Sequence, residues 1–277
     1  MTSTGVRATG GLVNVSTECP AETASALAGE TGRVLVFGGG YSGERFGLAL
    51  ARLGLPVTMT GRTPPTPTTT DPANLRRIHF DPTSGVLPEP AELADATHLL
   101  STIPPDSAGR DPVLNALAPT LRRLPLRWVG YLSTTGVYGD RGGAWVDEAT
   151  PVDPGLERSR ARLACENAWR QQGLPLQVFR LPAIYGPGRT PFRDLRQGTA
   201  RLIHKQGQVF CRIHVDDLVG AMLHCLALPS ERRPPILIVA DEAPCPSSET
   251  LGYAAHLLGC KLPDVQPWER IEASQIG

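Results

Sequence analysis

A short apolar run that leads into a glycine-rich turn and then a helical pattern constrains this chain more than any other feature. Residues 33–37 read RVLVF, which is typical of a buried strand. Residues 42–53 place apolar side chains at helical spacing, and the turn that joins the strand to this helix reads GGGYSG, residues 38–43. A dinucleotide-binding turn requires this context, after a strand and at the mouth of a helix.

The spacing of the glycines has a mechanical reason. Gly38, Gly40 and Gly43 fit the pattern G-x-G-x-x-G. The first glycine allows the tight turn, the second lets the backbone approach a pyrophosphate, and the third lets helix and strand pack closely. The phosphates would meet free N–H groups at the positive end of the helix, and Tyr41 and Ser42 are therefore expected to contact the cofactor. The sequence therefore predicts a dinucleotide site here, with a flexible loop as the alternative.

The end of the second expected strand, over residues 56–60, bears on the choice between NAD and NADP. An NAD-selective site would place an acidic residue there for the ribose 2′-hydroxyl. This chain instead has Thr60-Gly61-Arg62, with no Asp or Glu nearby. Because a guanidinium can bind a 2′-phosphate through two parallel hydrogen bonds, NADP is favoured over NAD. The alternative is that Arg62 is a solvated loop residue.

Strand and helix patterns alternate through the first two thirds of the chain. Further strands are expected over residues 56–60, 77–80, 97–103, 128–133 and 176–181, and helices over 89–94, 111–123 and 156–172. This alternation predicts an α/β fold, a doubly wound parallel sheet of the Rossmann type with helices on both faces. Asp111 is the expected N-cap of the 111–123 helix.

The last third has a looser pattern. Helices are expected over residues 192–204, 216–228 (capped by Asp216) and 247–258 (ended by Gly259), and extended segments over 209–215 and 236–239. We therefore expect a mobile tail over residues 1–32, a dinucleotide-binding domain over 33–185 and a small C-terminal substrate lobe over 186–277.

The composition excludes several classes of partner. Lys+Arg and Asp+Glu both total 27, so no net charge favours nucleic acid or an anionic membrane surface. No segment approaches the roughly 20 apolar residues of a membrane span. The 6 cysteines are scattered without a CxxC pair, which indicates free thiols rather than disulfides or a metal site. Together these features predict a cytoplasmic protein.

Four later segments, together with the glycine turn, resemble one family. They are VGYLSTTGVYGD (129–140), FRLPAIYGPGR (179–189), FCRIHVDDLVGAM (210–222) and ADEAPCPSSETLGYAAHLLG (240–259). Their order is similar to that in the extended short-chain dehydrogenases/reductases, the group that contains the NAD(P)-dependent sugar-nucleotide epimerases and dehydratases. The resemblance runs from about residue 33 to about residue 262. Family members usually continue with another helical segment, so the end at Gly277 predicts a reduced substrate lobe.

The resemblance implies further cofactor contacts. Asp81 would accept a hydrogen bond from the adenine amino group, and its alternative role is to form the turn before Pro82. Pro182 would lie near the nicotinamide. The loop that passes beneath the cofactor would consist of Thr102, Ile103 and Pro104.

The catalytic positions of the family are only partly matched. Thr134 falls at the Ser/Thr that polarises the substrate. The family's Y-x-x-x-K pair aligns with Arg158 and Arg162, and no tyrosine occurs between residues 139 and 184. Because arginine keeps its proton far above neutral pH, neither side chain can serve as a general acid near pH 7. Arg162 could still bind the ribose or a phosphate, and Arg158 an anionic substrate.

Three functions remain open on this basis. The first is an NADP-dependent oxidoreductase acting on an unknown small carbonyl or hydroxyl substrate, the second an NADP(H)-binding sensor or scaffold without turnover, and the third a nucleotide-sugar epimerase or dehydratase. The enzymes would need a substitute acid or a bound water. The candidate substitutes are Tyr41, Tyr138, Tyr185, Asp147 and Glu148.

Overall fold

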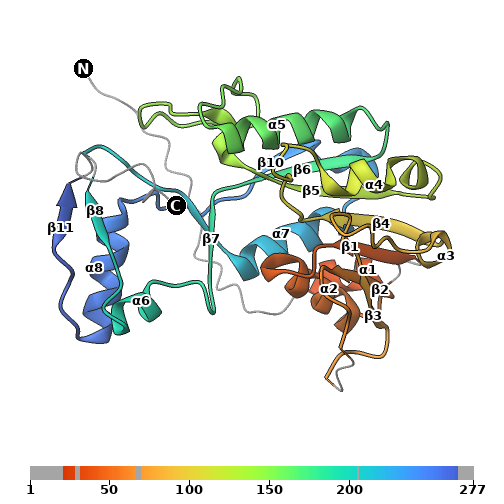
Figure 1. Ribbon diagram of the computed structural model, residues 1–277, viewed down its shortest axis with the longest axis horizontal. Helices are drawn as coiled ribbons and strands as arrows, with labels where there is room; N and C mark the ends of the chain where they lie inside the picture. The colour runs from red at the N-terminus through yellow and green to blue at the C-terminus, as the bar shows by residue number, and fades with distance from the viewer. Residues whose placement is uncertain (1–20, 29–31, 67–69, 205, 268–277) are drawn as a thin grey trace.

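A seven-stranded parallel sheet forms the centre of the protein. The computed structural model describes residues 21–28, 32–66, 70–204 and 206–267. The strand order is β10-β6-β5-β4-β1-β2-β3 (Figure 1). The strands are β1 (Arg33–Phe37), β2 (Val57–Gly61), β3 (Leu75–His79), β4 (Ala96–Ser101), β5 (Trp128–Thr134), β6 (Leu176–Leu181) and β10 (Ile236–Ile238). The order reverses between β1 and β4, and in open α/β sheets ligands bind at such a switch point, outside the carboxyl ends of the strands.

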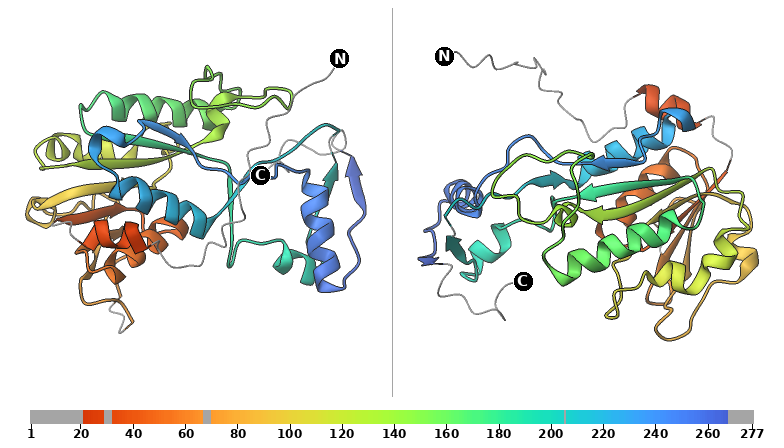
Figure 2. Two further views of the ribbon diagram at one scale, coloured as in Figure 1. Left: turned by 180° about the vertical axis from the view of Figure 1, so that it is seen from behind. Right: turned by 90° about the horizontal axis from the view of Figure 1, so that it is seen from above.

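Helices cover both faces of this sheet (Figures 1 and 2). On one face lie α1 (Ala21–Ala28), α2 (Tyr41–Arg52) and α7 (Val215–Ala227), and on the other α4 (Pro112–Leu121) and α5 (Glu157–Arg170). The short helices η1 (Thr135–Tyr138), α3 (Pro90–Leu93) and η2 (Ser230–Arg232) lie in connections. Two apolar layers result; Phe46, Trp128 and Met222 are buried in one, and Leu117, Tyr131 and Trp169 in the other. The predicted doubly wound Rossmann-type fold is confirmed.

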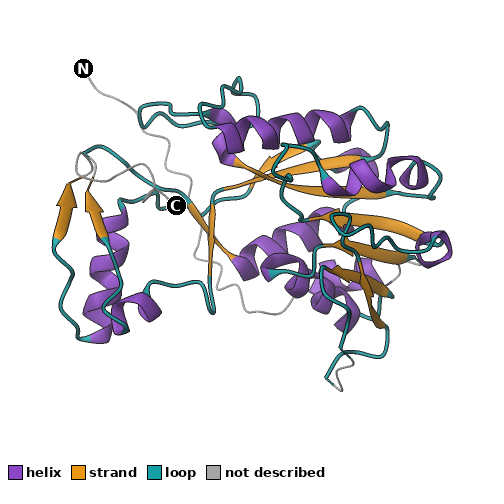
Figure 3. Ribbon diagram, viewed as in Figure 1, coloured by secondary structure: helices purple, strands orange, loops and turns teal. Residues whose placement is uncertain are grey.

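A smaller lobe stands beyond the carboxyl edge of the sheet (Figure 3). It contains α6 (Phe192–Arg196), α8 (Ser247–Leu258) and the parallel pair β8 (Leu202–His204) and β11 (Val265–Pro267). A second parallel pair, β7 (Ala183–Tyr185) and β9 (Arg212–His214), connects the lobe with the end of β6 and the start of α7. No helix among the residues described here has the length and apolar character needed to cross a membrane.

Several boundaries differ from the sequence-based expectation. The helix expected over 192–204 ends at Arg196, because Gly198 takes a positive φ of 66° and the chain then extends to pair as β8. Residues 21–28 form a helix rather than a tail, since Leu27 is fully buried; residues 1–20 lie outside the described part.

The helix caps were predicted with mixed success. Asp111 caps α4 as expected, accepting from the N–H groups of Val113 and Leu114. Asp216 does not cap α7: the helix begins at Val215, and the side chain of His214 accepts from the Asp216 N–H. Imidazole is not among the preferred capping groups, so the sequence pattern favoured the aspartate. Gly259 ends α8 in the left-handed conformation, as expected.

Candidate functional site

The glycine turn lies at the switch point of the sheet, between β1 and α2, and each glycine has a different steric environment. Gly38 has a φ of +98°, and a Cβ atom there would lie 2.4 Å from Thr102 Oγ1. A Cβ atom on Gly43 would lie 2.1 Å from the Gly38 carbonyl oxygen. A Cβ atom on Gly40 would meet nothing within 4 Å. The turn therefore needs glycine at two positions for its own packing, while the third glycine opens onto free space.

Side chains from the neighbouring strands hold the turn in place. The Gly38 N–H donates to Thr60 Oγ1 at 3.0 Å, and the Gly39 N–H donates to the Thr60 carbonyl at 2.7 Å. Thr102 Oγ1 donates to the Gly38 carbonyl at 2.8 Å. The predicted cofactor-loop residue Thr102 is thus part of the structure of the turn itself.

The first turn of α2 offers donors to a ligand above Gly40. Gly40 is the N-cap and has no side chain to cap the helix. The first helical residues, Tyr41 and Ser42, carry backbone N–H groups of the kind that remain without an intrahelical acceptor. Donors at a positive helix end beside an open glycine can hold a phosphate, so the residues present fit the diphosphate of a dinucleotide.

The residues expected to contact the adenosine part of the dinucleotide follow β2 and β3. The side chain of Arg62 is exposed, and its carbonyl lies 2.9 Å from His79 Nε2. The carboxylate of Asp81 accepts from Ser84 Oγ at 2.7 Å and from the Thr83 N–H at 3.1 Å. These bonds, that of Ser84 foremost, hold the pKa of Asp81 below its usual value. The carboxylate of Asp81 thus forms the turn that the sequence offered as its alternative role.

The remaining expected cofactor residues gather at the same sheet edge. Ile103 and Pro104 follow β4, and Pro182 follows β6. Thr134 ends β5, and its Oγ1 accepts from the Gly136 N–H at 3.1 Å. Because β4, β5 and β6 are neighbours in a parallel sheet, their carboxyl ends place these residues along one edge.

Helix α5 does not present Arg158 and Arg162, the two arginines at the family's catalytic positions, in the same way. Arg162 Nη1 donates to the Ile103 carbonyl (3.3 Å), the Tyr131 hydroxyl (3.2 Å) and the Leu132 carbonyl (3.1 Å). Arg158 is exposed on the first turn and has no hydrogen bond or ion pair within the described segments. Arg162 therefore ties α5 to the ends of β4 and β5, and Arg158 is free to meet an anion.

The candidate substitute acids divide by their surroundings. Tyr138 is buried, and its hydroxyl accepts from Arg180 Nη1 at 2.9 Å. Glu148 Oε1 accepts from the Ile238 N–H at 2.7 Å, and Asp147 binds Thr150. These three groups are occupied by the protein itself.

Tyr185 and Tyr41 are the other two candidates. Tyr185 is 38% exposed, and its ring lies edge-on to that of His214 at 5.1 Å. Burial, followed by the nearby Asp241 carboxylate, raises the pKa of Tyr185. The hydroxyl of Tyr41 is buried and finds no hydrogen-bond partner among the described residues. Of the three candidate tyrosines, Tyr185 is the exposed one.

A buried polar network lies beneath the site, and the sequence reasoning missed it. Glu166 on α5 accepts from Ser133 Oγ on β5, from Arg180 Nη2 on β6 at 2.8 Å and from Arg170 Nη2 at 2.9 Å. Burial opposes ionisation of Glu166, but the bonds from Arg180 and Ser133 prevail and lower its pKa. The one sequence signal was the position of Glu166 four residues after Arg162 on the same expected helix.

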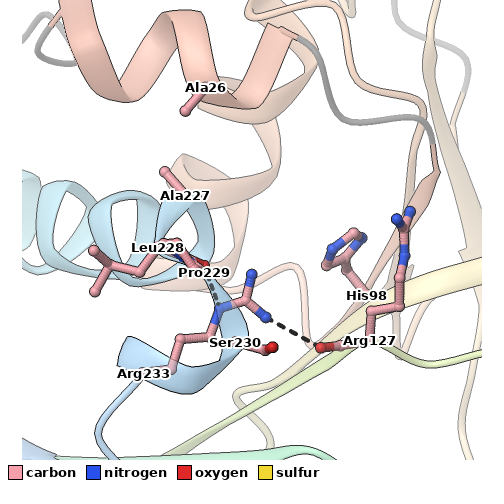
Figure 4. A pocket seen from close by; sticks show the side chains of 8 residues that line it. All are labelled: Ala26, His98, Arg127, Ala227, Leu228, Pro229, Ser230 and Arg233. Carbon is pink, nitrogen blue, oxygen red and sulfur yellow. Dashed lines mark hydrogen bonds between the residues drawn. The ribbon is translucent and has the colours of Figure 1, made fainter.

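A cavity of about 470 Å³ lies at the opposite, amino edge of the sheet (Figure 4). Its lining is Ala26, His98, Arg127, Ala227, Leu228, Pro229, Ser230 and Arg233. Burial and the charges of Arg127 and Arg233 lower the pKa of His98 to about 4. This cavity contains none of the expected cofactor residues, which all lie at the carboxyl edge.

Comparisons with known proteins place the fold. No family model and no curated protein matches the sequence. A solved structure of a conserved protein of unknown function from Silicibacter pomeroyi DSS is 41% identical, with a TM-score of 0.77 and coverage of 87% of this chain and 84% of that one.

Two more distant structures contain NAD. UDP-glucuronic acid 4-epimerase from Bacillus cereus in complex with NAD is 16% identical, with a TM-score of 0.72 and coverage of 85% of this chain and 86% of that one. DesIV, a dTDP-glucose 4,6-dehydratase from Streptomyces venezuelae with NAD and TYD bound, is 20% identical, with a TM-score of 0.67 and coverage of 85% and 84%. The chain therefore belongs to the same family as the Silicibacter pomeroyi protein, and it has the Rossmann-like fold of the NAD-dependent epimerases and dehydratases, the extended short-chain dehydrogenase/reductase fold.

Proposed function

We propose that this protein binds a nicotinamide dinucleotide at the carboxyl edge of its central sheet and uses it in an oxidoreductase reaction on a small carbonyl or hydroxyl substrate. The observation that carries the proposal is the open space at Gly40, in a turn where Gly38 and Gly43 are fixed by packing. Because Gly40 lies at the N-terminus of α2 and at the switch point of the sheet, the room beside it would let a phosphate approach the backbone N–H groups. The NAD in the Bacillus cereus and Streptomyces venezuelae structures supports a dinucleotide as that ligand.

Different residues would bind the diphosphate, the adenine and the nicotinamide of the dinucleotide. The N–H groups of Tyr41 and Ser42 would hold the diphosphate. Asp81 retains acceptor capacity for the adenine amino group, because a carboxylate has about four lone-pair sites. The nicotinamide end would lie against the loop after β4 and against Pro182.

NADP is the proposed form of the cofactor. Arg62 directly follows β2 and has an exposed guanidinium, and His79 contacts its carbonyl rather than its side chain. No ion pair involving Arg62 occurs within the described residues, so the guanidinium is available to a 2′-phosphate. The neighbouring Arg77 is not, since it binds both Glu44 and Asp71.

The protein's own residues would orient the substrate. A bound nicotinamide supplies hydride exchange. The Thr134 hydroxyl, whose oxygen already accepts from the Gly136 N–H, keeps its proton for donation to a substrate oxygen. Arg158 would bind an anionic part of the substrate. Proton transfer would then depend on Tyr185 or on a bound water, because Arg162 is committed to the strand ends and Tyr138 to Arg180.

A sensor without turnover is the second candidate. It is favoured by the commitment of Arg162 to the strand ends and by the sequence of α5, which has no tyrosine or lysine to supply the family's acid–base pair. A nucleotide-sugar epimerase or dehydratase is a third candidate, supported by the activities of the structures with the same fold. It has the same need for a proton-transferring group.

Two measurements separate these functions. NADPH fluorescence should change on titration with the protein, with micromolar affinity; an unchanged signal would contradict all three. If NADPH binds, NADPH oxidation with a panel of aldehydes, ketones and nucleotide sugars supports the oxidoreductase. A panel without oxidation and without sugar-nucleotide conversion, monitored by chromatography, favours the sensor.

A further inference from the structure

The guanidinium groups of two arginines contact the ring of Tyr41, which lies beside the glycine turn. The guanidinium carbons of Arg45 and Arg189 each lie 4.1 Å from the centroid of its ring. Arg45 belongs to the same helix, whereas Arg189 comes from the segment after β7, far along the chain. Neither arginine has a carboxylate partner within the part of the chain that the structure describes. Two cations on one ring, at the positive end of a helix, form a local excess of positive charge.

The two arginines differ in how far the protein uses them. Arg45 Nη1 donates to the Tyr41 carbonyl at 2.9 Å, and its Nη2 donates to the Pro187 carbonyl at 3.4 Å. Arg45 therefore links the segment after β7 to the first turn of α2 through hydrogen bonds. The guanidinium of Arg189 is exposed, and its contact with Tyr41 is the one interaction found for it among the described residues. All five of its N–H donors remain available.

The backbone conformation of residues 186–189 brings Arg189 close to Tyr41. Gly186 and Arg189 exchange backbone hydrogen bonds of 2.9 and 3.3 Å, which closes a tight turn. Gly186 has a φ of +143°, and a Cβ atom there would lie 2.8 Å from the Tyr41 hydroxyl and 2.8 Å from Val215 Cγ1. Only glycine lets this turn pack so closely on Tyr41, so the position of Arg189 follows from the local fold.

We propose that Arg189 binds the diphosphate of the dinucleotide from the side opposite the helix N-terminus, and that Tyr41 positions its guanidinium for this. The inference rests on the proposed dinucleotide binding. Tyr41 joins the two halves of the site, because its backbone N–H is one of the helix donors and its ring carries Arg189. A planar guanidinium that stacks on an aromatic ring keeps its edge free for phosphate oxygens. The diphosphate is then held by the backbone of α2 and by a side chain from the C-terminal third.

Competition binding tests this assignment and separates the cofactor from a phosphate on the substrate. NADPH affinity is measured by fluorescence in the absence of substrate, and ADP and 2′-AMP are measured as competitors. Arg189→Gln should weaken NADPH and ADP about tenfold, the size of one charge-assisted hydrogen bond. It should leave 2′-AMP within about twofold, because 2′-AMP carries no diphosphate. Arg193→Ala is the matched control, since Arg193 is in the same segment, exposed and paired with Asp194 at 3.2 Å.

The role of Tyr41 needs its own variants. Tyr41→Phe keeps the ring and should bind NADPH as the wild type does, whereas Tyr41→Leu should lose about as much affinity as Arg189→Gln. The double variant Tyr41→Leu/Arg189→Gln should lose no more than either single change, since both act through one contact. Thermal unfolding of each variant checks that the fold is intact.

The outcomes are distinct. Unchanged ADP and NADPH affinity in Arg189→Gln would overturn the assignment and leave Arg189 to a phosphate of the substrate, with the proposed function intact. Equal weakening of ADP and 2′-AMP would overturn it as well, because the loss would not depend on the diphosphate. No NADPH binding by the wild-type protein would overturn both proposals.

Discussion

Glu166 on α5 and Arg180 on β6 form an ion pair inside the protein. Arg180 Nη2 lies 2.8 Å from Glu166 Oε2, and the two side chains are 4% and 0% exposed. Ser133 and Arg170 complete the bonding of the carboxylate, and Tyr138 accepts from Arg180. The pair joins the helix that carries Arg158 and Arg162 to the strand that leads to Pro182. It therefore fixes α5 against β6 near the carboxyl edge of the sheet, where the substrate is proposed to bind.

Removing one partner should be costly. Glu166→Ala leaves the Arg180 charge buried without its counter-ion, which typically destabilises a protein by about 3–5 kcal/mol. Glu166→Gln should cost less, because the amide still accepts from a guanidinium. Urea unfolding measures both values, with Glu242→Ala on an exposed loop as the control expected within about 0.5 kcal/mol of wild type. A cost below about 1 kcal/mol for Glu166→Ala would contradict a buried, fully bonded pair.

The elements of the fold that the sequence predicted best are those with local causes. The strand, glycine turn and helix at residues 33–53 depend on spacing within one short segment, and the observed β1 and α2 match the expected ranges within a residue or two. The helix expected over 156–172 spans Glu157–Arg170. The order of the strands follows from pairing between distant segments, so the alternation of patterns predicted a parallel sheet but not its arrangement.

The parts of the site that escaped prediction depend on distant partners. Ser133 and Glu166 are 33 residues apart, and nothing local shows that they meet. Arg162 was correctly placed on a helix, but its direction is set by carbonyl groups at the ends of β4 and β5. The contact between Tyr41 and Arg189 likewise depends on the turn at Gly186, which follows a strand that the sequence did not indicate.

His98 should make stability depend on pH. Its pKa in the folded protein is lowered to about 4, from 6.5, by burial and by the charges of Arg127 and Arg233. Between these two values the unfolded chain binds a proton that the folded protein does not. The free energy of unfolding should therefore fall as pH decreases from 6.5 to 4, by at most about 3 kcal/mol. The stabilising contribution of neutral His98 to the free energy of unfolding is fully present above pH 6.5.

A variant isolates the effect of His98. His98→Gln removes the titration, so its free energy of unfolding should vary less between pH 6.5 and 4 than that of wild type, whatever its absolute stability. Urea unfolding at intervals across that range gives the comparison. His79→Gln is the control, because His79 lies at the other edge of the sheet and outside the cavity. Parallel curves for wild type and His98→Gln would show that His98 titrates normally.

Arg62 should decide between the two cofactors. Arg62→Asp removes the guanidinium proposed for the 2′-phosphate and adds a like charge, so NADPH should bind more weakly by about 1–3 kcal/mol. NADH has no 2′-phosphate and should lose much less. Fluorescence titration of both cofactors with wild type and variant gives the ratio of affinities. An equal loss for NADPH and NADH would show that Arg62 does not contact the 2′-phosphate.

Two alanine substitutions in the glycine turn should have opposite effects on stability and binding. Gly40 has a φ of −88°, which alanine adopts, and its added Cβ meets nothing within 4 Å. Gly40→Ala should therefore unfold within about 0.5 kcal/mol of wild type, yet lose dinucleotide affinity tenfold or more, because the methyl group occupies the space left for the diphosphate. Gly43→Ala places a Cβ atom 2.1 Å from the Gly38 carbonyl and should destabilise the fold itself. Thermal unfolding and NADPH titration of the pair check this, and normal NADPH binding by a folded Gly40→Ala protein would remove the main support for the dinucleotide site.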